Sequence, residues 1–350
     1  MLSLVVAVGF LVAIPAGPAS AATTVLNATD TGWWSDTGEH GAFNSNYIVG
    51  NYGYDYGDHN DYFTFDLTTA VPCGAITGAT LSAPNPLGSG SPRPYTLYDV
   101  STPAAALDTT DTGSPAGIAI FNDLGSGTVF GSVTPTTVND TPIVVPFSPA
   151  GVAALNAARG GTFSVGGDLT DAVLNDFLLG NSGDDTVSLT LTTEDPFQPD
   201  AQIRGGLASA YLGGGIYNQD GLGQTFGRKA KPGFGDQFNV KIENDGGCSD
   251  TFLVQGAGNY NKFKVTYWSG PLNVTPSVVS GTFQTGPLDP GSSELLRVFI
   301  YTVRGVRIGT SMTDLISVTS NGDPSVSDVV GATLRVSKTA GDFNSQLPVP

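Results

Sequence analysis

Short stretches of alternating apolar and polar residues dominate this sequence, and Gly, Pro, Asn and Asp interrupt them throughout. In residues 62–67, for example, Phe63, Phe65 and Leu67 alternate with more polar neighbours, as in a strand with one buried face. The 47 Gly and 23 Pro break the chain too often for long helices, but they follow no collagen-like period. The pattern therefore predicts an all-β protein.

The first part of the chain predicts a jelly-roll-like β-sandwich with one short helix. Ser148 is a suitable N-cap, Pro149 suits the first helical position, Val152 and Leu155 form an apolar face, and residues 160–161 end the helix. Long Gly-rich loops separate the predicted strands, as in jelly rolls. These strands are residues 62–67, 75–81, 95–100, 143–147, 161–165 and 186–191.

The second part predicts an immunoglobulin-like β-sandwich without a helix, because its strand signals are closely spaced and joined by turn sequences. The predicted strands are residues 224–229, 237–243, 250–255, 263–268, 278–285, 295–303, 314–319 and 329–336.

A step in charge separates the two parts. Residues 1–200 hold 2 basic and 20 acidic residues, whereas residues 201–350 hold 12 basic and 11 acidic ones. The step and the prolines near it predict domains at 22–196 and 197–337, followed by a flexible tail at 338–350. The overall charge of −17 argues against nucleic acid or an anionic membrane as a partner.

The amino-terminal residues predict export. Residues 2–14 form an apolar run, and Ala19-Ser20-Ala21 matches the small-residue pattern of a cleavage site. We therefore expect a signal peptide over 1–21 and a secreted mature chain that begins at Ala22. No later stretch is apolar and long enough to predict a membrane span.

Five segments of the first part resemble a family of secreted bacterial proteins with a jelly-roll domain, often called DNRLRE-like, and exported proteins with a PEP-type sorting tail. They are residues 60–67 (NDYFTFDL), 76–81 (ITGATL), 95–102 (YTLYDVST), 121–132 (FNDLGSGTVFGS) and 154–161 (ALNAARGG). Residues 241–246, 250–254 and 288–292 resemble bacterial immunoglobulin-like modules. The PEP-type tail is absent here. The resemblance implies a surface or matrix role and no catalytic motif.

A dense aromatic segment near the start of the first domain is the predicted binding face. Trp33 and Trp34 open it, and Tyr52, Tyr54 and Tyr56 alternate with smaller residues, so the three tyrosines share one face of an extended chain. Flat rings beside amide and carboxylate groups suit a carbohydrate ligand. The alternative is that these rings belong to the sandwich core.

Oxygen ligands within the same segment suggest a structural calcium ion. Asp55, Asp58, Asn60 and Asp61 lie within seven residues and offer the hard ligands that Ca²⁺ prefers, although their spacing is not that of an EF-hand loop. A solvated turn rich in Asp is the alternative.

Catalysis has few candidates. His40 and His59 are the only histidines, and either could act as a base beside Asp36, Glu39, Asp58 or Asp61. No nucleophile elbow or zinc-binding helix motif accompanies them. Whether Cys73 and Cys248 pair with each other stays open at this point.

These observations predict a secreted, non-catalytic protein of the cell envelope or extracellular matrix that binds or adheres, with an extracellular glycan as the favoured ligand. A structural surface protein that assembles with its own copies is one alternative. A secreted hydrolase that uses the His40/His59 region is the other.

Overall fold

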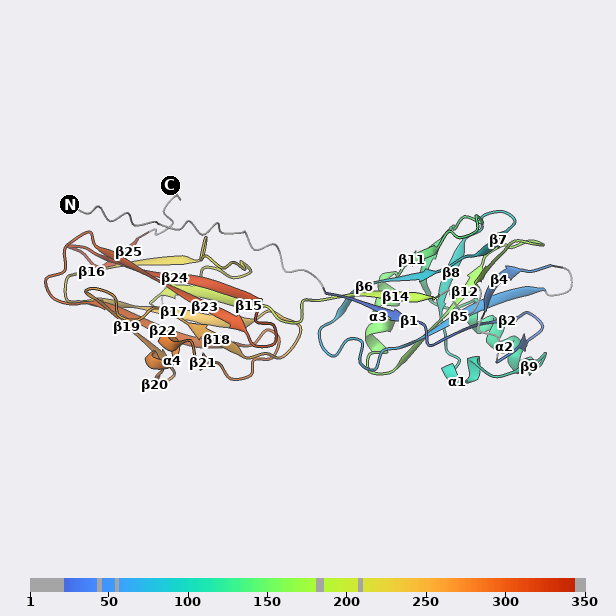
Figure 1. Cartoon of the computed structure of the whole chain (residues 1–350), viewed down its shortest axis with the longest axis horizontal. Helices are drawn as coiled ribbons and strands as arrows, with labels where there is room; N and C mark the ends of the chain where they lie inside the picture. Colours follow the sequence, from blue (N-terminus) through green and yellow to red (C-terminus); the bar gives the residue numbers. More distant parts are fainter. Residues whose placement is uncertain (1–21, 43–45, 54–56, 181–185, 207–209, 344–350) are drawn as a thin grey trace, which may run out of the picture. The chain divides into compact units, whose positions relative to one another are not determined.

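The computed structural model describes residues 22–42, 46–53, 57–180, 186–206 and 210–343 (Figure 1). The chain divides into two compact units between Glu194 and Asp195, two residues before the boundary that the sequence predicts. Antiparallel sheets make up most of both units, so the all-β fold class is confirmed. The predicted signal peptide lies outside the described residues.

The first unit is a sandwich of two antiparallel sheets. One sheet holds, in order, β1 (Ala22–Asn27), β14 (Ser188–Thr193), β6 (Ile76–Ala83) and β11 (Ile143–Pro146). The other holds β10 (Val129–Val133), β8 (Tyr95–Asp99), β12 (Thr162–Leu169), β5 (Asp58–Asp66), β4 (Tyr47–Asn51), β13 (Phe177–Gly180) and β7 (Leu87–Ser89), with β2 (Asp30–Ser35) also paired to β5. Alternate side chains such as Phe63, Phe65 and Leu81 fill the core between the sheets.

The described residues of the first unit form three helices, where the sequence predicts one. The predicted helix is present as α3 (Pro149–Ala157), and the Ser148 hydroxyl accepts a hydrogen bond from the Gly151 N–H. The other two, α1 (Ala104–Leu107) and α2 (Pro115–Leu124), are not predicted from the sequence. Helix α2 begins with the same signal as α3, because Ser114 caps it and Pro115 is its first residue.

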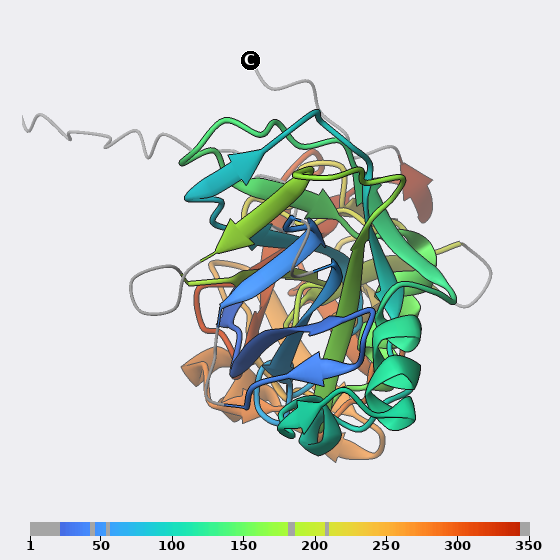
Figure 2. The ribbon, with the colours of Figure 1, turned by 90° about the vertical axis from the view of Figure 1, so that its right-hand side faces the viewer.

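Strand β5 is buried on both faces. One face joins the main core, while the opposite face packs against a smaller core of Trp34, Tyr62, Leu107 and Leu124, which includes residues of α1 and α2. Figure 2 shows these helices in green, beside the blue strands of the first unit. A short two-stranded pair, β3 (Glu39–His40) with β9 (Asp111–Thr112), lies next to α2.

The second unit is also a two-sheet sandwich. One sheet holds β15 (Pro199–Gly205), β17 (Gly235–Asn244), β22 (Ser293–Thr302), β19 (Phe263–Ser269) and β20 (Leu272–Asn273). The other holds β21 (Phe283–Gln284), β18 (Phe252–Gln255), β23 (Ser311–Ser320), β24 (Ser327–Val336), β16 (Thr225–Ala230) and β25 (Gly341–Phe343). Strand β16 runs parallel to β24, whereas the other pairs in the described residues are antiparallel.

Two predictions for the second unit need correction. A helix, α4 (Thr275–Ser280), occupies the start of the strand predicted at 278–285. Pro276 in its first turn and the left-handed Gly281 at its end outweigh the strand preference of Val278 and Val279. Strand β25 also lies within the segment predicted as a flexible tail.

Both Cys73 and Cys248 are disulfide-bonded.

Two glycines in β12 permit close approach on both sides of the sheet. A Cβ at Gly166 would lie 2.4 Å from the carbonyl oxygen of Leu124, at the end of α2. A Cβ at Gly167 would lie 2.2 Å from a carboxylate oxygen of Asp61. A side chain at Gly166 would therefore prevent α2 from docking against the sheet, and one at Gly167 would collide with Asp61.

We expect Gly166→Ala to lower the free energy of unfolding by about 2 kcal/mol, because the Leu124 backbone that it meets cannot rotate away. Gly161→Ala is the matched control, since its Cβ would lie no closer than 3.5 Å to any neighbour. Urea denaturation of both variants measures the difference. Equal stability of the two variants would contradict the close packing of α2 on β12.

Candidate functional site

The described part of the predicted aromatic face does not form one exposed surface. Trp34 is fully buried, and its indole N–H donates to the Leu107 carbonyl at 3.1 Å. Trp33 is half-buried, and Tyr52 packs edge-on against Phe177 with ring centroids 4.7 Å apart. Tyr54 and Tyr56 lie outside the described residues. Trp34 is thus part of the small core, as in the alternative interpretation of this segment.

The two histidines are buried among the same aromatic rings. His40 stacks on Trp34 at 4.8 Å, and His59 meets Trp33 edge-on at 4.7 Å. His40 Nδ1 lies 2.7 Å from the Trp33 carbonyl oxygen, which makes Nδ1 the protonated nitrogen. No hydrogen bond joins either ring to a carboxylate or hydroxyl side chain among the described residues. This environment gives the hydrolase hypothesis no support.

Burial changes the protonation of both imidazoles. It lowers the pKa of His40 and of His59 below the usual 6.5, despite nearby carboxylates that act in the opposite direction. Those carboxylates are Asp108 near His40, and Asp36 and Asp58 near His59. Both rings are therefore neutral at pH 7.

The predicted calcium ligands occupy separate environments. Asp58 is exposed and accepts a hydrogen bond from the Asn51 amide at 2.9 Å, whereas the Asn60 amide donates to the Phe121 carbonyl. Asp61 is fully buried, and the Tyr95 hydroxyl lies 2.9 and 3.0 Å from its two oxygens. Asp55 lies outside the described residues. The other three do not converge. Asn60 and Asp61 point to opposite faces of β5, whereas Asp58 and Asn60 share a face but bind different partners.

Burial raises the pKa of Asp61 well above its ordinary value, and the hydrogen bond from Tyr95 offsets only part of this effect. The Asp61–Tyr95 pair is a buried polar contact inside the sandwich, with no surface on which an ion could exchange with solvent.

A different carboxylate group in the second unit has the spacing of metal ligands. Oxygens of Asp200, Glu243 and Asp245 lie within 4.8 Å of one another among the described residues. The register of β15 and β17 pairs Asp200 with Glu243, so residues far apart in sequence meet, and no local motif could have predicted the group. Burial raises the pKa of Asp200 to about 6.

Neutralising contacts already surround this group. Lys241 Nζ lies 2.5 Å from Glu243 Oε2, and the Gln202 amide donates to both Asp200 and Glu243, at 2.6 and 2.8 Å. Because the chain supplies its own cation and donors here, we assign no metal to the group.

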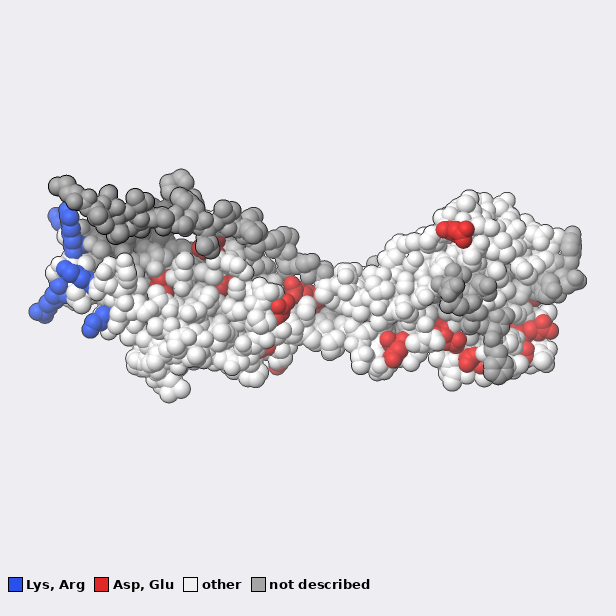
Figure 3. Space-filling view, viewed as in Figure 1, with Lys and Arg blue, Asp and Glu red and all other residues white. Residues whose placement is uncertain are grey.

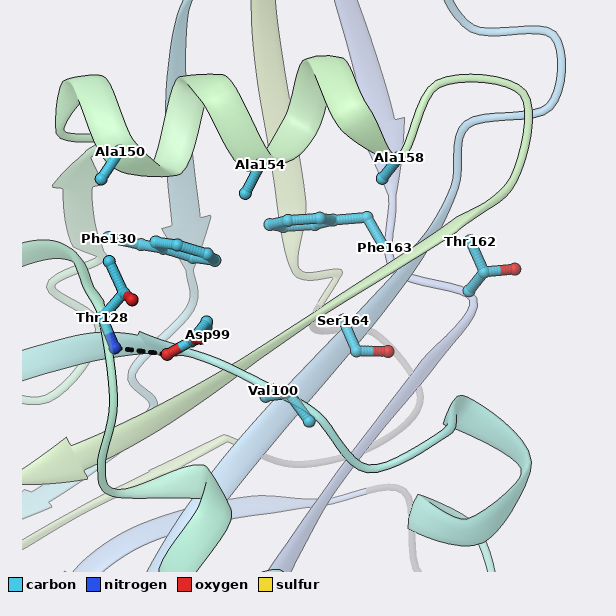
Figure 4. A pocket seen from close by; sticks show the side chains of 10 residues that line it. All are labelled: Asp99, Val100, Thr128, Phe130, Ala150, Ala154, Ala158, Thr162, Phe163 and Ser164. Atoms are coloured by element: carbon cyan, nitrogen blue, oxygen red, sulfur yellow. Dashed lines mark hydrogen bonds between the residues drawn. The ribbon is translucent and has the colours of Figure 1, made fainter.

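A groove beside α3 is a candidate binding site in the described part of the first unit. It has a volume of about 420 Å³ and lies between α3 and strands β8, β10 and β12. Phe130 and Phe163 form its floor, with ring planes 20° apart and centroids separated by 6.0 Å. In Figure 4, Ala150, Ala154 and Ala158 point from α3 toward the two rings.

Polar side chains line the opposite rim of this groove. They are Asp99, Thr128, Thr162 and Ser164. The Asp99 carboxylate accepts a hydrogen bond from the Thr128 N–H, which fixes its position (Figure 4). The groove therefore combines an apolar floor with a rim of hydroxyl and carboxylate groups. Its size falls within the range of small-molecule sites, about 300–1,000 Å³.

This groove is not among the sites that the sequence predicts. Its signal is the i, i+4, i+8 spacing of Ala150, Ala154 and Ala158, which places three small side chains along one face of α3. The two rings come from strands that are far apart in sequence, so only the fold brings them under that face.

The comparisons with known proteins do not assign this chain to a family. No protein-family model and no curated protein matches this sequence. Among solved structures, the chain is similar to the N-terminal domain of a Streptococcus gordonii adhesin, with 9% identity and a TM-score of 0.20, over 83% of this chain and 66% of that one.

Two further structures are similar at the same level. The C-terminal domain of an antigen I/II-family protein from Streptococcus pyogenes shows 10% identity and a TM-score of 0.22, over 90% of this chain and 99% of that one. The collagen adhesin of S. aureus shows 9% identity and a TM-score of 0.19, over 91% and 94%. Likeness at these scores supports no argument about fold or function. None of the described helices has the length and apolar character needed to cross a membrane.

We expect acidification to destabilise the first unit through its histidines. Because the native pKa of His40 lies below 6.5, the unfolded chain binds a proton that the native state does not, and the free energy of unfolding falls as the pH drops through this value. His40→Gln removes this contribution, so it should lose less stability than the wild type between about pH 7.5 and about pH 5.5.

Urea unfolding followed by tryptophan fluorescence measures this difference, since Trp33 and Trp34 contact the imidazole. An equal loss of stability in the wild type and the variant over that pH range would contradict a neutral, buried His40.

Proposed function

We propose that this chain is a secreted, non-catalytic binding module of the cell envelope or extracellular matrix, and that its first unit binds carbohydrate in the groove beside α3. The observation that supports this most directly is the pairing of an apolar floor, made of alanine methyl groups beside two nearly buried phenylalanine rings, with a hydroxyl and carboxylate rim in one open groove. The buried histidines, which lack a described catalytic partner, agree with a non-catalytic role.

The chemistry of the groove suits a sugar ring. Phe130 and Phe163 belong to the sandwich core and are only 4% and 5% exposed, so the apolar surface open to the C–H face of a sugar comes mainly from the alanine methyl groups of α3. Thr128 and Thr162 are exposed and can donate to or accept from sugar hydroxyls, and the Asp99 carboxylate accepts from them. A hydrophobic ligand would leave this rim unpaired, which disfavours lipids and simple aromatic compounds.

The partly exposed residues of the originally predicted face stay within the proposal as a secondary contact. Trp33 and Tyr52 are each partly exposed. They are a separate site from the groove, so substitutions can distinguish the two.

Ala154→Phe should weaken glycan binding by more than about tenfold in affinity. The new ring fills the groove above Phe163, and no core side chain is removed. A glycan array with the secreted chain from Ala22 onward identifies the ligand, and calorimetry with that ligand measures its affinity. Ala153→Phe is the matched control, since Ala153 is exposed on the same helix and does not line the groove.

The outcomes separate the two sites. Binding that Ala154→Phe abolishes and Ala153→Phe leaves intact supports the groove. Binding that survives Ala154→Phe but disappears in a folded Tyr52→Ala variant would move the site to the aromatic segment. A chain that binds no glycan would contradict the carbohydrate assignment altogether.

A further inference from the structure

Basic side chains gather at one end of the second unit. Loops after β16, β22 and β24, together with the loop before β19, meet there through backbone hydrogen bonds. Val303 N–H donates to the Lys262 carbonyl, Thr302 N–H to Phe234, and Ser337 N–H to Ala230. We call this surface the basic end. It consists of five exposed residues, Lys231, Lys262, Arg304, Arg307 and Lys338.

The cations of the basic end are not neutralised by the chain. None of the five forms an ion pair with another described residue. The nearby Asp236 is already paired with Arg228 at 2.9 Å. Figure 3 shows Lys and Arg side chains, in blue, gathered at one end of the second unit.

Apolar side chains are exposed beside these cations. Phe234 is 65% exposed, Tyr260 64% and Ile308 50%. Phe234 and Tyr260 lie in the same loops as Lys231 and Lys262. Exposed rings among unpaired cations indicate a surface that contacts another macromolecule rather than small counterions.

The first unit carries the complementary charge at one of its own ends. Asp36, Glu39, Asp58 and Asp108 are exposed there, and Asp111 lies beside them in β9. The Asp36 N–H donates to the Asp58 carbonyl, and β3 pairs with β9, which brings these segments together. We call this surface the acidic end.

No basic residue neutralises the acidic end. Residues 22–194 contain only Arg93 and Arg159. Arg93 forms an ion pair with Asp176 at 2.7 Å, and the Arg159 guanidinium donates to the Val71 carbonyl, beyond the opposite end of β5. Hydrogen bonds from Ser114 and neighbouring backbone keep the pKa of Asp111 low, so this carboxylate is ionised.

We propose that copies of this chain associate head to tail, with the basic end of one copy against the acidic end of the next. The basic end and the acidic end carry similar numbers of opposite charges, and neither is neutralised within its own unit. The two surfaces are therefore complementary in this arrangement. The two surfaces differ from each other, so the contact is heterologous. Each added copy leaves one free end of each kind, and the assembly can grow. This inference does not depend on the carbohydrate site.

Light scattering and sedimentation velocity test the proposal on the full mature chain. The average mass should rise with protein concentration from about 10 µM to about 1 mM. It should fall again as salt increases from about 50 mM to about 500 mM, because screening weakens surface charge pairs. A mass that stays monomeric at every concentration and low salt would overturn the proposal.

Charge reversal shows which surfaces make the contact. One variant reverses the basic end (Lys231→Glu, Arg304→Glu, Arg307→Glu), and another reverses the acidic end (Asp36→Lys, Glu39→Lys, Asp108→Lys). None of these six side chains has a hydrogen bond or ion pair in the described structure, so both variants should fold, as circular dichroism can verify. Each variant alone should remain monomeric.

An equimolar mixture of the two variants is the matched control. The acidic-end variant keeps an intact basic end, and the basic-end variant keeps an intact acidic end, so the mixture should form a one-to-one dimer that does not grow further. Failure of the two folded variants to form this dimer would overturn the proposal, as would association of the basic-end variant with itself.

Binding of a monomeric wild-type chain to dextran sulfate, lost when the basic end is reversed, would instead assign that end to a polyanion. Glycan binding at the α3 groove is measured separately, by the Ala154→Phe variant, so failure of one proposal leaves the other testable.

Discussion

Burial of β5 on both of its faces shapes the rest of the first unit. The core side of the strand supplies Phe63 and Phe65 to the sandwich, and the other side supplies Tyr62 to the small core under α1 and α2. A central strand with two buried faces must satisfy its polar side chains internally. Asn60 therefore binds a backbone carbonyl of α2, and Asp61 accepts a hydrogen bond from Tyr95.

The same constraint explains why the described aromatic and acidic residues of this segment do not form one continuous exposed surface. Trp34 pairs with Asn60 across β2 and β5, and it is enclosed when α1 covers the sheet. The histidines lose their solvent contact in the same layer. An open groove lined by apolar and polar side chains lies instead beside α3, next to Phe130 and Phe163, and this is where we propose that the ligand binds.

The unevenly distributed charges of the chain gather on two surfaces of the structure, the basic end and the acidic end. In the sequence, it is a contrast between an acidic first part and a nearly neutral second part. In the second unit, ion pairs such as Arg228 with Asp236 neutralise some cations along the strands, whereas the loops at one end keep theirs unpaired. This distribution suits an association that salt and protein concentration control.

The sequence alone determined the all-β class, most strand positions and helix α3, because alternation and capping residues act over a few neighbouring positions. It missed α2 although Ser114 and Pro115 carry the signal of α3, and it predicted a strand where Pro276 and Gly281 delimit α4. Only the tertiary structure decided which side chains are accessible. Burial of Trp34 and Asp61, the meeting of Asp200 with Glu243, and the α3 groove all depend on contacts between distant segments, which local patterns do not encode.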